Sequence, residues 1–198
     1  MLPCENNSPK TTDIDTRIMN HDRIEIIVDK DICLKIVGIE DAESIFNTIN
    51  HERKYLEEWL PFVEDTRDIS YTKAFIENSN GANSPNLTFT ISYHNHFAGL
   101  IGFKDTDFDN KKTEIGYWLS ESFQHKGIVT RSCKALTNYA FDRMDMNRIQ
   151  IKAAQENLKS RNIPERIGFT CEGIERDGEL HSRGFVDLVI YSLLKAER

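Results

Sequence analysis

The chain has 198 residues, 39% of them hydrophobic and 29% charged, which suits a soluble globular protein with its own core. It has no run of roughly 18 apolar residues for a membrane helix, and its polar N-terminus has no secretory signal, so we expect a cytoplasmic protein. The net charge of −7, from 25 basic and 32 acidic residues, disfavours a nucleic-acid partner because an acidic surface repels phosphates.

Hydrophobic periodicity predicts the elements in chain order, after a flexible tail at residues 1–22. The expected strands lie at 23–28, 33–38, 86–94, 96–105, 113–119, 147–154, 169–175 and 185–194. The expected helices lie at 41–49, 53–60, 70–80, 128–144 and 157–168. Pro61 is expected to stop the second of these helices, because proline cannot continue one. The order of strands and helices predicts one mixed α/β domain over residues 23–198.

The four cysteines, Cys4, Cys33, Cys133 and Cys171, include no CxxC pair. In a cytosolic chain they are expected to be reduced, and the last three fall within apolar patterns that indicate packing. The six histidines show neither HxxxH nor HExxH spacing. No metal site is therefore predicted.

The segment SFQHKGIVT (residues 122–130) joins an expected strand to an expected helix through a turn with one glycine, Gly127. A helix N-terminus presents about four N–H groups without helical partners and a partial positive charge. Without a Cβ at Gly127, a pyrophosphate could approach these groups closely. The turn therefore predicts a phosphate cradle, although an ordinary strand-to-helix turn fits these residues equally well. The Walker sequence GxxxxGK[ST] and the sequence GxGxxG are both missing.

Two segments resemble the signature of a known superfamily. QHKGIV (124–129) is similar to the acyl-CoA loop of the GNAT acetyltransferases, Q/R-x-x-G-x-G/A, and NLKSRNIPERIGF (157–169) is similar to their N-x-x-S/A…E-K-x-G-F block. The segments EIGYWL (114–119), YLEEWLPFV (55–63) and YSLL (191–194) look like the RimJ/RimL branch, ribosomal-protein N-terminal acetyltransferases and their relatives. The resemblance covers roughly residues 23 to 196, with these segments in the order that the family shows.

The resemblance implies both a fold and a cosubstrate. The fold is an α/β GNAT domain, with a mixed, mostly antiparallel central sheet that is flanked by helices and splayed between the strands at 114–119 and 148–154. The cosubstrate is acetyl-CoA, whose pantetheine arm would pair with a strand end like an added strand, and whose pyrophosphate would bind the turn. The residues implied for acetyl-CoA are Tyr117, Trp118, Leu119, Gln124, His125, Lys126, Gly127, Ile128, Val129, Thr130 and Asn157.

Three positions depart from the family pattern. His125 stands where glycine is common, and Val129 stands where glycine or alanine is usual; binding through backbone amides tolerates both. Many members carry a tyrosine seven residues after the Asn, as the acid for the leaving thiolate, and Pro164 occupies this position here. A proline so far into a helix removes a backbone hydrogen bond and should kink the helix. The chain cannot use that acid.

The resemblance to RimL-type enzymes assigns the base to Glu179, acting through water, and the thiol-side donor to Ser160. Glu114, at the start of the strand at the splay, is the competing base, and His181 could take the proton itself. Each residue also fits an ordinary structural role. Glu179 and His181 fit a solvated loop, and Ser160 fits a serine that supports its own helix.

The resulting hypothesis is an acetyl-CoA-dependent N-acetyltransferase that transfers directly to an amine, because no cysteine lies in the matched motifs. Tyr55 and Trp59 look like one wall of the acceptor pocket, or like the packing of a helix on the sheet. The favoured acceptor is the N-terminal α-amine of a (ribosomal) protein. The alternatives are a small amine, such as an amino acid, polyamine or drug, and a non-catalytic acyl-CoA-binding regulator. The chain is expected to be a monomer or a homodimer.

Overall fold

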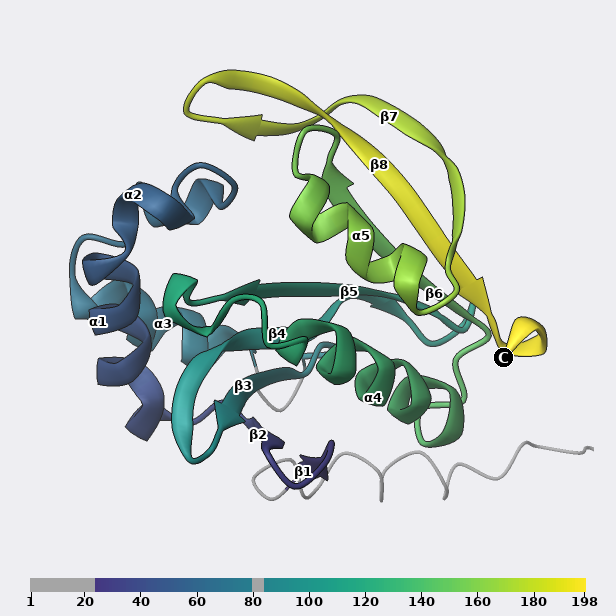
Figure 1. Cartoon of the computed structure of the whole chain (residues 1–198), viewed down its shortest axis with the longest axis horizontal. Helices are drawn as coiled ribbons and strands as arrows, with labels where there is room; N and C mark the ends of the chain where they lie inside the picture. The colour runs from purple at the N-terminus through teal and green to yellow at the C-terminus, as the bar shows by residue number, and fades with distance from the viewer. Residues whose placement is uncertain (1–23, 80–83) are drawn as a thin grey trace, which may run out of the picture.

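The computed structural model describes residues 24–79 and 84–198, so the tail expected at 1–22 lies outside the described residues (Figure 1). The strands are β1 (Glu25–Ile27), β2 (Ile32–Ile36), β3 (Thr88–Tyr93), β4 (His96–Asp107), β5 (Lys112–Leu119), β6 (Arg148–Ala154), β7 (Thr170–His181) and β8 (Gly184–Leu194). The α-helices are α1 (Ala42–His51), α2 (Arg53–Leu56), α3 (Ile69–Ser79), α4 (Ile128–Asp142) and α5 (Leu158–Arg166). Their order along the chain is the predicted one.

The strands form a single sheet in the order β1-β2-β3-β4-β5-β6-β8-β7. Every neighbouring pair is antiparallel except β5 and β6, so the expected mixed and mostly antiparallel sheet is confirmed. The register of β5 and β6 runs from Lys112 opposite Arg148 to Glu114 opposite Gln150. Beyond these pairs the two strands diverge, with α5 between β5 and the β7–β8 hairpin (Figure 1). This is the expected splay.

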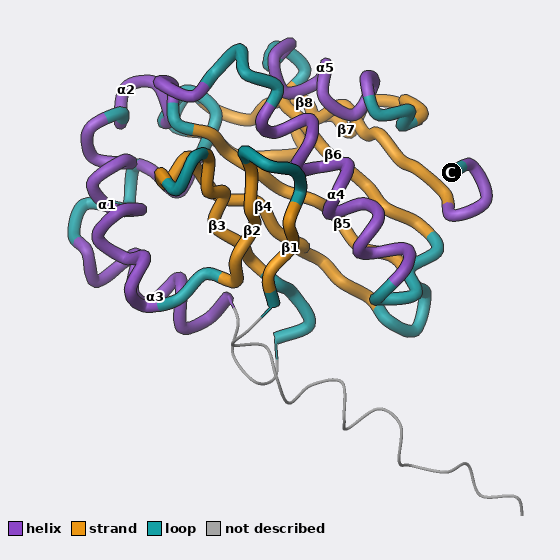
Figure 2. The backbone as a smooth tube through the Cα atoms, turned by 60° about the horizontal axis from the view of Figure 1, so that its bottom comes forward, coloured by secondary structure: helices purple, strands orange, loops and turns teal. Residues whose placement is uncertain are grey.

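Successive residues of β4 point to opposite faces of the sheet and belong to two different cores. Leu100 packs in the core that contains residues of α1 and α3. Ile101 packs in the larger core, which contains Cys133 and Leu136 of α4. The helices α1 to α3 gather beside one end of the sheet, whereas α4 crosses it (Figure 2). The sheet is therefore covered on both faces, and the gap at the splay lies between the two halves of the sheet.

Two element boundaries differ from the prediction by more than two residues. The helix α2 ends at Leu56, and Pro61 begins a 3₁₀ helix (Pro61–Val63) instead of ending an α-helix. The strand β7 continues to His181, so that Glu179 lies on a strand and not in a loop. The polar residues that suggested a loop are absorbed by a register shift between Glu175 and Glu179, and the side chain of Asp187 accepts the Asp177 N–H at 2.9 Å.

Candidate active site

The turn before α4 leaves the N-terminus of this helix open. A short 3₁₀ helix (Glu121–Phe123) follows β5, and Gly127 is the N-cap residue of α4. Gly127 has φ +66°, a left-handed conformation that suits glycine, and it has no side chain to cap the helix. His125 also has a positive φ, of 61°. Because the first helical N–H groups have no partner within the helix, they are available to an anion.

A groove of about 400 Å³ lies in front of this turn. A Cβ placed on Gly127 would meet no atom within 4 Å, so the backbone there faces open space that a side chain would begin to fill. Lys126, Lys159 and Arg166 line the groove, and its lining among the described residues includes no aspartate or glutamate. In a chain of net charge −7, this local excess of positive charge suits a pyrophosphate. The residues present therefore fit the phosphates of acetyl-CoA.

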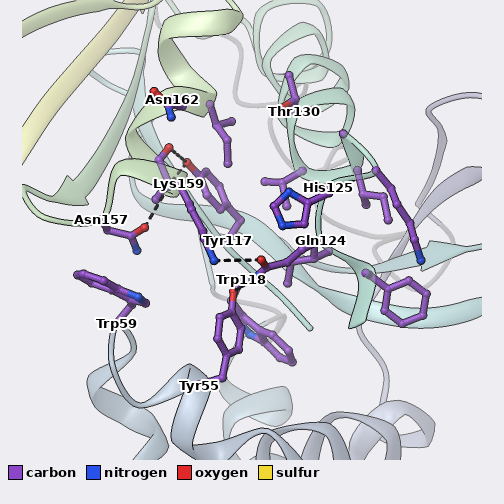
Figure 3. Close-up of a pocket in the computed structure, with 18 of the residues that line it drawn as sticks. Tyr55, Trp59, Tyr117, Trp118, Gln124, His125, Thr130, Asn157, Lys159 and Asn162 are labelled. Carbon is purple, nitrogen blue, oxygen red and sulfur yellow. Dashed lines mark hydrogen bonds between the residues drawn. The ribbon is translucent and has the colours of Figure 1, made fainter. Parts of the chain in front are cut away.

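Every residue that the family resemblance implies for acetyl-CoA lines this groove. Helix α5 adds residues that the sequence reasoning missed, namely Lys159, Asn162, Ile163 and Arg166. Their spacing of i, i+3, i+4 and i+7 marks one helix face and could have found them. Figure 3 shows Lys159 reaching across the groove, where its Nζ donates to Gln124 Oε1 at 3.1 Å. Gln124 Nε2 in turn donates to the hydroxyl of Tyr55, so these three side chains link α5 to α2.

A second cavity, of about 610 Å³, adjoins the groove at the splay. The two hollows share the following lining residues: Trp59, Leu60, Tyr117, Trp118, Asn157 and Ser160. Of the two aromatic residues expected at the acceptor wall, Trp59 lines both hollows, whereas Tyr55 lines the groove and not the cavity. The arrangement gives two substrates separate approaches that meet beside Tyr117 and Ser160.

Asn157 and Ser160 are held at this junction by the first turn of α5. The Asn157 side chain caps the helix, with its Oδ1 accepting the Ser160 N–H at 3.0 Å. The hydroxyl of Ser160 lies 3.2 Å from that of Tyr117. Pro164 does not break the helix, which continues to Arg166. Pro164 has no N–H to donate to the Ser160 carbonyl, and the Tyr117 hydroxyl, from outside the helix, donates to this carbonyl instead.

The three other candidate groups differ in where they lie. Glu179 lines the second cavity, its side chain is 41% exposed, and its Oε2 lies 2.7 Å from His181 Nε2. His181 is almost fully buried, and its Nδ1 has no hydrogen-bond partner in the described part of the chain. Glu114 is 3% exposed and lines neither hollow; Lys104 Nζ lies 2.7 Å from it, and Gln150 donates to it at 3.2 Å. Of the two glutamates, only Glu179 faces a cavity that a substrate can enter.

Comparisons with known proteins agree with this geometry. The acetyltransferase (GNAT) domain family matches residues 31–170, and the chain therefore belongs to the GNAT family. YdaF of Bacillus subtilis (strain 168), which carries the name of a ribosomal N-acetyltransferase, is 37% identical over 173 residues, covering 86% of this chain and 94% of YdaF. The ribosomal-protein-serine acetyltransferase of Escherichia coli (strain K12) is 27% identical over 173 residues, covering 84% and 94% of the two chains.

Solved structures of similar proteins share this fold, and two of them contain acetyl-CoA or coenzyme A. The microcin C7 self-immunity acetyltransferase MccE, solved with acetyl-CoA and AMP, has a TM-score of 0.81 at 32% identity, over 84% of this chain and 94% of MccE. RimL, solved with coenzyme A, has a TM-score of 0.84 at 24% identity, over 88% and 100% of the two chains, which shows the shared fold. The chain is an acetyl-CoA-dependent N-acetyltransferase. The alternative of a non-catalytic regulator is therefore not retained.

Among the described residues, no group of three His, Cys, Asp or Glu side chains could hold a metal ion. No helix in the same part of the chain is long and apolar enough to cross a membrane.

Proposed function

We propose that the enzyme acetylates the N-terminal α-amine of a protein, with Glu179 as the base and Ser160 as the donor to the leaving thiolate. The observation that carries this proposal is the meeting of the two hollows, because it brings the groove suited to acetyl-CoA against a cavity lined by two accessible carboxylates, Glu179 and Asp65, of which the family resemblance assigns the base to Glu179. The relatives named as ribosomal-protein acetyltransferases support a protein acceptor.

An α-amine suits a weak carboxylate base. With a pKa of about 7.8, an α-amino group is about a quarter neutral near pH 7.4, whereas a lysine of pKa about 10.4 is about one part in a thousand neutral. Glu179 would accept, through water, the proton that the amine loses as the new C–N bond forms. Ser160 would donate a hydrogen bond to the sulfur as the C–S bond breaks and the electron pair stays on sulfur. Solvent then returns to the thiolate the proton that the amine released.

The wall of the cavity also favours a peptide over a polycation. Phe62, Tyr71 and Phe75 line the cavity and remain exposed, and they offer apolar contact to the first side chains of a peptide. Lys104 and Lys152 line the same cavity and offset the charge of Asp65 and Glu179, so the lining has no excess of acids to attract a polyamine. A spermidine N(1)-acetyltransferase of Escherichia coli (strain K12) is 26% identical over 85 residues, which is 43% of this chain. Spermidine is accordingly the second acceptor to test.

The test is an acetylation assay that follows both the mass of the acceptor and the release of CoA. The acceptors are peptides with a free N-terminus, the same peptides with a blocked N-terminus and an internal lysine, and spermidine. We expect an acetyl mass shift on the peptides with a free N-terminus and none on the blocked ones. Acetylation of spermidine alone, with no shift on any free N-terminus, would overturn the proposed acceptor and leave the acetyltransferase activity intact.

A further inference from the structure

The carbonyl of Ser160 has no hydrogen-bond donor inside its own helix. In an α-helix, the carbonyl of residue i accepts the N–H of residue i+4. For Ser160 this residue is Pro164, which has no N–H. The donor comes from β5, because the Tyr117 hydroxyl lies 3.1 Å from the Ser160 carbonyl oxygen. Figure 3 shows the ring of Tyr117 at the groove, between the residues of α5 and the turn before α4.

The same tyrosine holds the Ser160 side chain. The Tyr117 O–H is directed to the Ser160 carbonyl, so its oxygen lone pairs are free to accept, and Ser160 Oγ donates to that oxygen at 3.2 Å. The backbone N–H of Ser160 is held by Asn157 at 3.0 Å. The backbone and the hydroxyl of Ser160 are therefore both fixed at the junction between the groove and the cavity.

Tyr117 is poorly suited to act as the acid itself. Burial raises the pKa of Tyr117 well above its usual range, because the charged phenolate would be desolvated. If Tyr117 gave its proton to the thiolate, the resulting phenolate would lie in apolar surroundings, since the side chain packs against the larger core. The geometry leaves Tyr117 the role of holding a neighbour.

We propose that Tyr117 is a positioning residue for Ser160, and that Pro164 makes this role possible by leaving the Ser160 carbonyl without a donor in α5. Tyr117 holds the Ser160 oxygen at the junction by accepting the Ser160 O–H, and this O–H turns from the Tyr117 oxygen to the sulfur as the thiolate forms. The proline at the position of the family's usual tyrosine becomes part of the arrangement. This inference rests on the proposed role of Ser160. It does not depend on which amine is the acceptor.

The first test is a double-mutant cycle with Tyr117→Phe, Ser160→Ala and the double variant. The rate of CoA release is measured with a free amine that the enzyme acetylates and also with water as the only nucleophile, because the leaving group is the same in both reactions. We expect each single variant to lower kcat about tenfold, with little change in KM for acetyl-CoA, and the double variant to be no slower than Ser160→Ala. Tyr139→Phe is the matched control, since Tyr139 stacks on Phe103 in the same core but lines neither hollow.

Three results of this cycle would overturn the inference. In one, Tyr117→Phe lowers the melting temperature and leaves kcat unchanged, which is the behaviour of a packing residue. In another, Tyr117→Phe slows the enzyme equally with and without the Ser160 hydroxyl, so that the two residues act independently. If Ser160→Ala itself leaves CoA release unchanged in both reactions, the role of Ser160 in the proposed function fails, and the inference fails with it.

The second test restores the missing backbone donor. Pro164→Ala supplies an N–H for the Ser160 carbonyl, so the Tyr117 hydroxyl is no longer needed there and can turn away, and the Ser160 hydroxyl loses the partner that holds it at the junction. We expect the melting temperature to rise or hold while kcat falls several-fold. In the Tyr117→Phe background, Pro164→Ala should recover stability and not kcat. An unchanged kcat in Pro164→Ala would show that the proline has no part in placing the Ser160 hydroxyl.

Discussion

Glu179 and Glu114 are two carboxylates near the splay with different surroundings. Glu114 is buried and paired with Lys104, whereas Glu179 lines the cavity and contacts His181. We expect Glu179→Gln to lower kcat/KM at neutral pH by a factor of about 10² or more, because glutamine keeps the shape and loses the basic oxygen. The loss should shrink at higher pH, where the amine is already neutral. A pH profile of kcat/KM for the two proteins measures both effects.

Glu114→Gln is the matched comparison for this prediction. It leaves Lys104 without its charged partner and should lower the melting temperature more than kcat/KM, because Glu114 lines neither hollow. Acetyl-CoA affinity should hold in both variants. If Glu179→Gln costs less than about threefold while Glu114→Gln costs a hundredfold, the base is Glu114.

Gly127 and His125 make a second pair at the residue scale. Gly127→Trp places a large side chain in front of the α4 N-terminus, so we expect it to abolish acetyl-CoA binding in calorimetry while the circular dichroism of the fold remains. His125→Gly keeps the backbone amide and relieves a positive φ of 61°, so affinity should change little. Binding by Gly127→Trp within a few-fold of the wild type would show that the phosphates lie elsewhere.

At the scale of elements, one carboxylate ties three strands together. Glu172 of β7 accepts from Arg148 of β6 at 2.6 Å and from Ser192 of β8 at 2.7 Å. These hydrogen bonds, the one from Arg148 above all, lower the pKa of Glu172 from 4.5 to about 2. A carboxylate with a lowered pKa stabilises the folded state fully above its unfolded pKa. That contribution is lost as the pH falls from about 4.5 towards about 2.

We therefore expect Glu172→Gln to lower the melting temperature by about 1–3 °C at neutral pH, a small change because the pair is partly exposed. The difference from the wild type should shrink as the pH falls through this window, and thermal melts at a series of pH values measure it. Glu156→Gln, an exposed glutamate in the turn before α5, is the control and should change little at any pH. A difference that stays constant down to pH 3 would contradict the assignment.

The sequence predicts the order of the elements well, because apolar periodicity and turn residues are local signals. It is wrong about the end of β7, since Asp177 and Gly178 read as a loop, whereas the strand continues through a register shift with Asp177 bonded to Asp187 on the neighbouring strand. The local pattern of strand, turn and helix places Gly127 in its turn. It could not show that Tyr117 donates the hydrogen bond to Ser160 that Pro164 cannot donate. That contact joins residues 43 positions apart, so no local pattern carries it.

At the scale of the whole molecule, the three cysteines in the described part of the chain line neither hollow. Cys133, on α4, is buried in the larger core. Cys171 is exposed on β7, and the half-buried Cys33 donates to Glu25 at 2.9 Å. Desolvation and the bond to Glu25 raise the pKa of Cys33 to about 12, so this thiol is a poor nucleophile. Cys4 lies outside the described residues.

A variant with Cys133→Ala and the other three cysteines changed to serine should therefore keep most of its activity, and the intact mass of the wild-type enzyme with acetyl-CoA should show no acetyl-enzyme. The melting temperature of the variant checks that the core tolerates the loss of the Cys133 sulfur. A folded variant without activity, together with a trapped acetyl group on the wild type, would contradict direct transfer.

The short parallel pairing between β5 and β6 has a consequence for amide hydrogen exchange. Because their register stops at Glu114 and Gln150, residues 115–119 of β5 have a strand partner on the β4 side only. In the free enzyme, part of this segment should take up deuterium quickly while the amides bonded to β4 stay protected. Acetyl-CoA lying along the segment as an added strand would slow the fast fraction. Deuterium uptake at 115–119 thus reports occupancy of the groove in the absence of any acceptor or turnover.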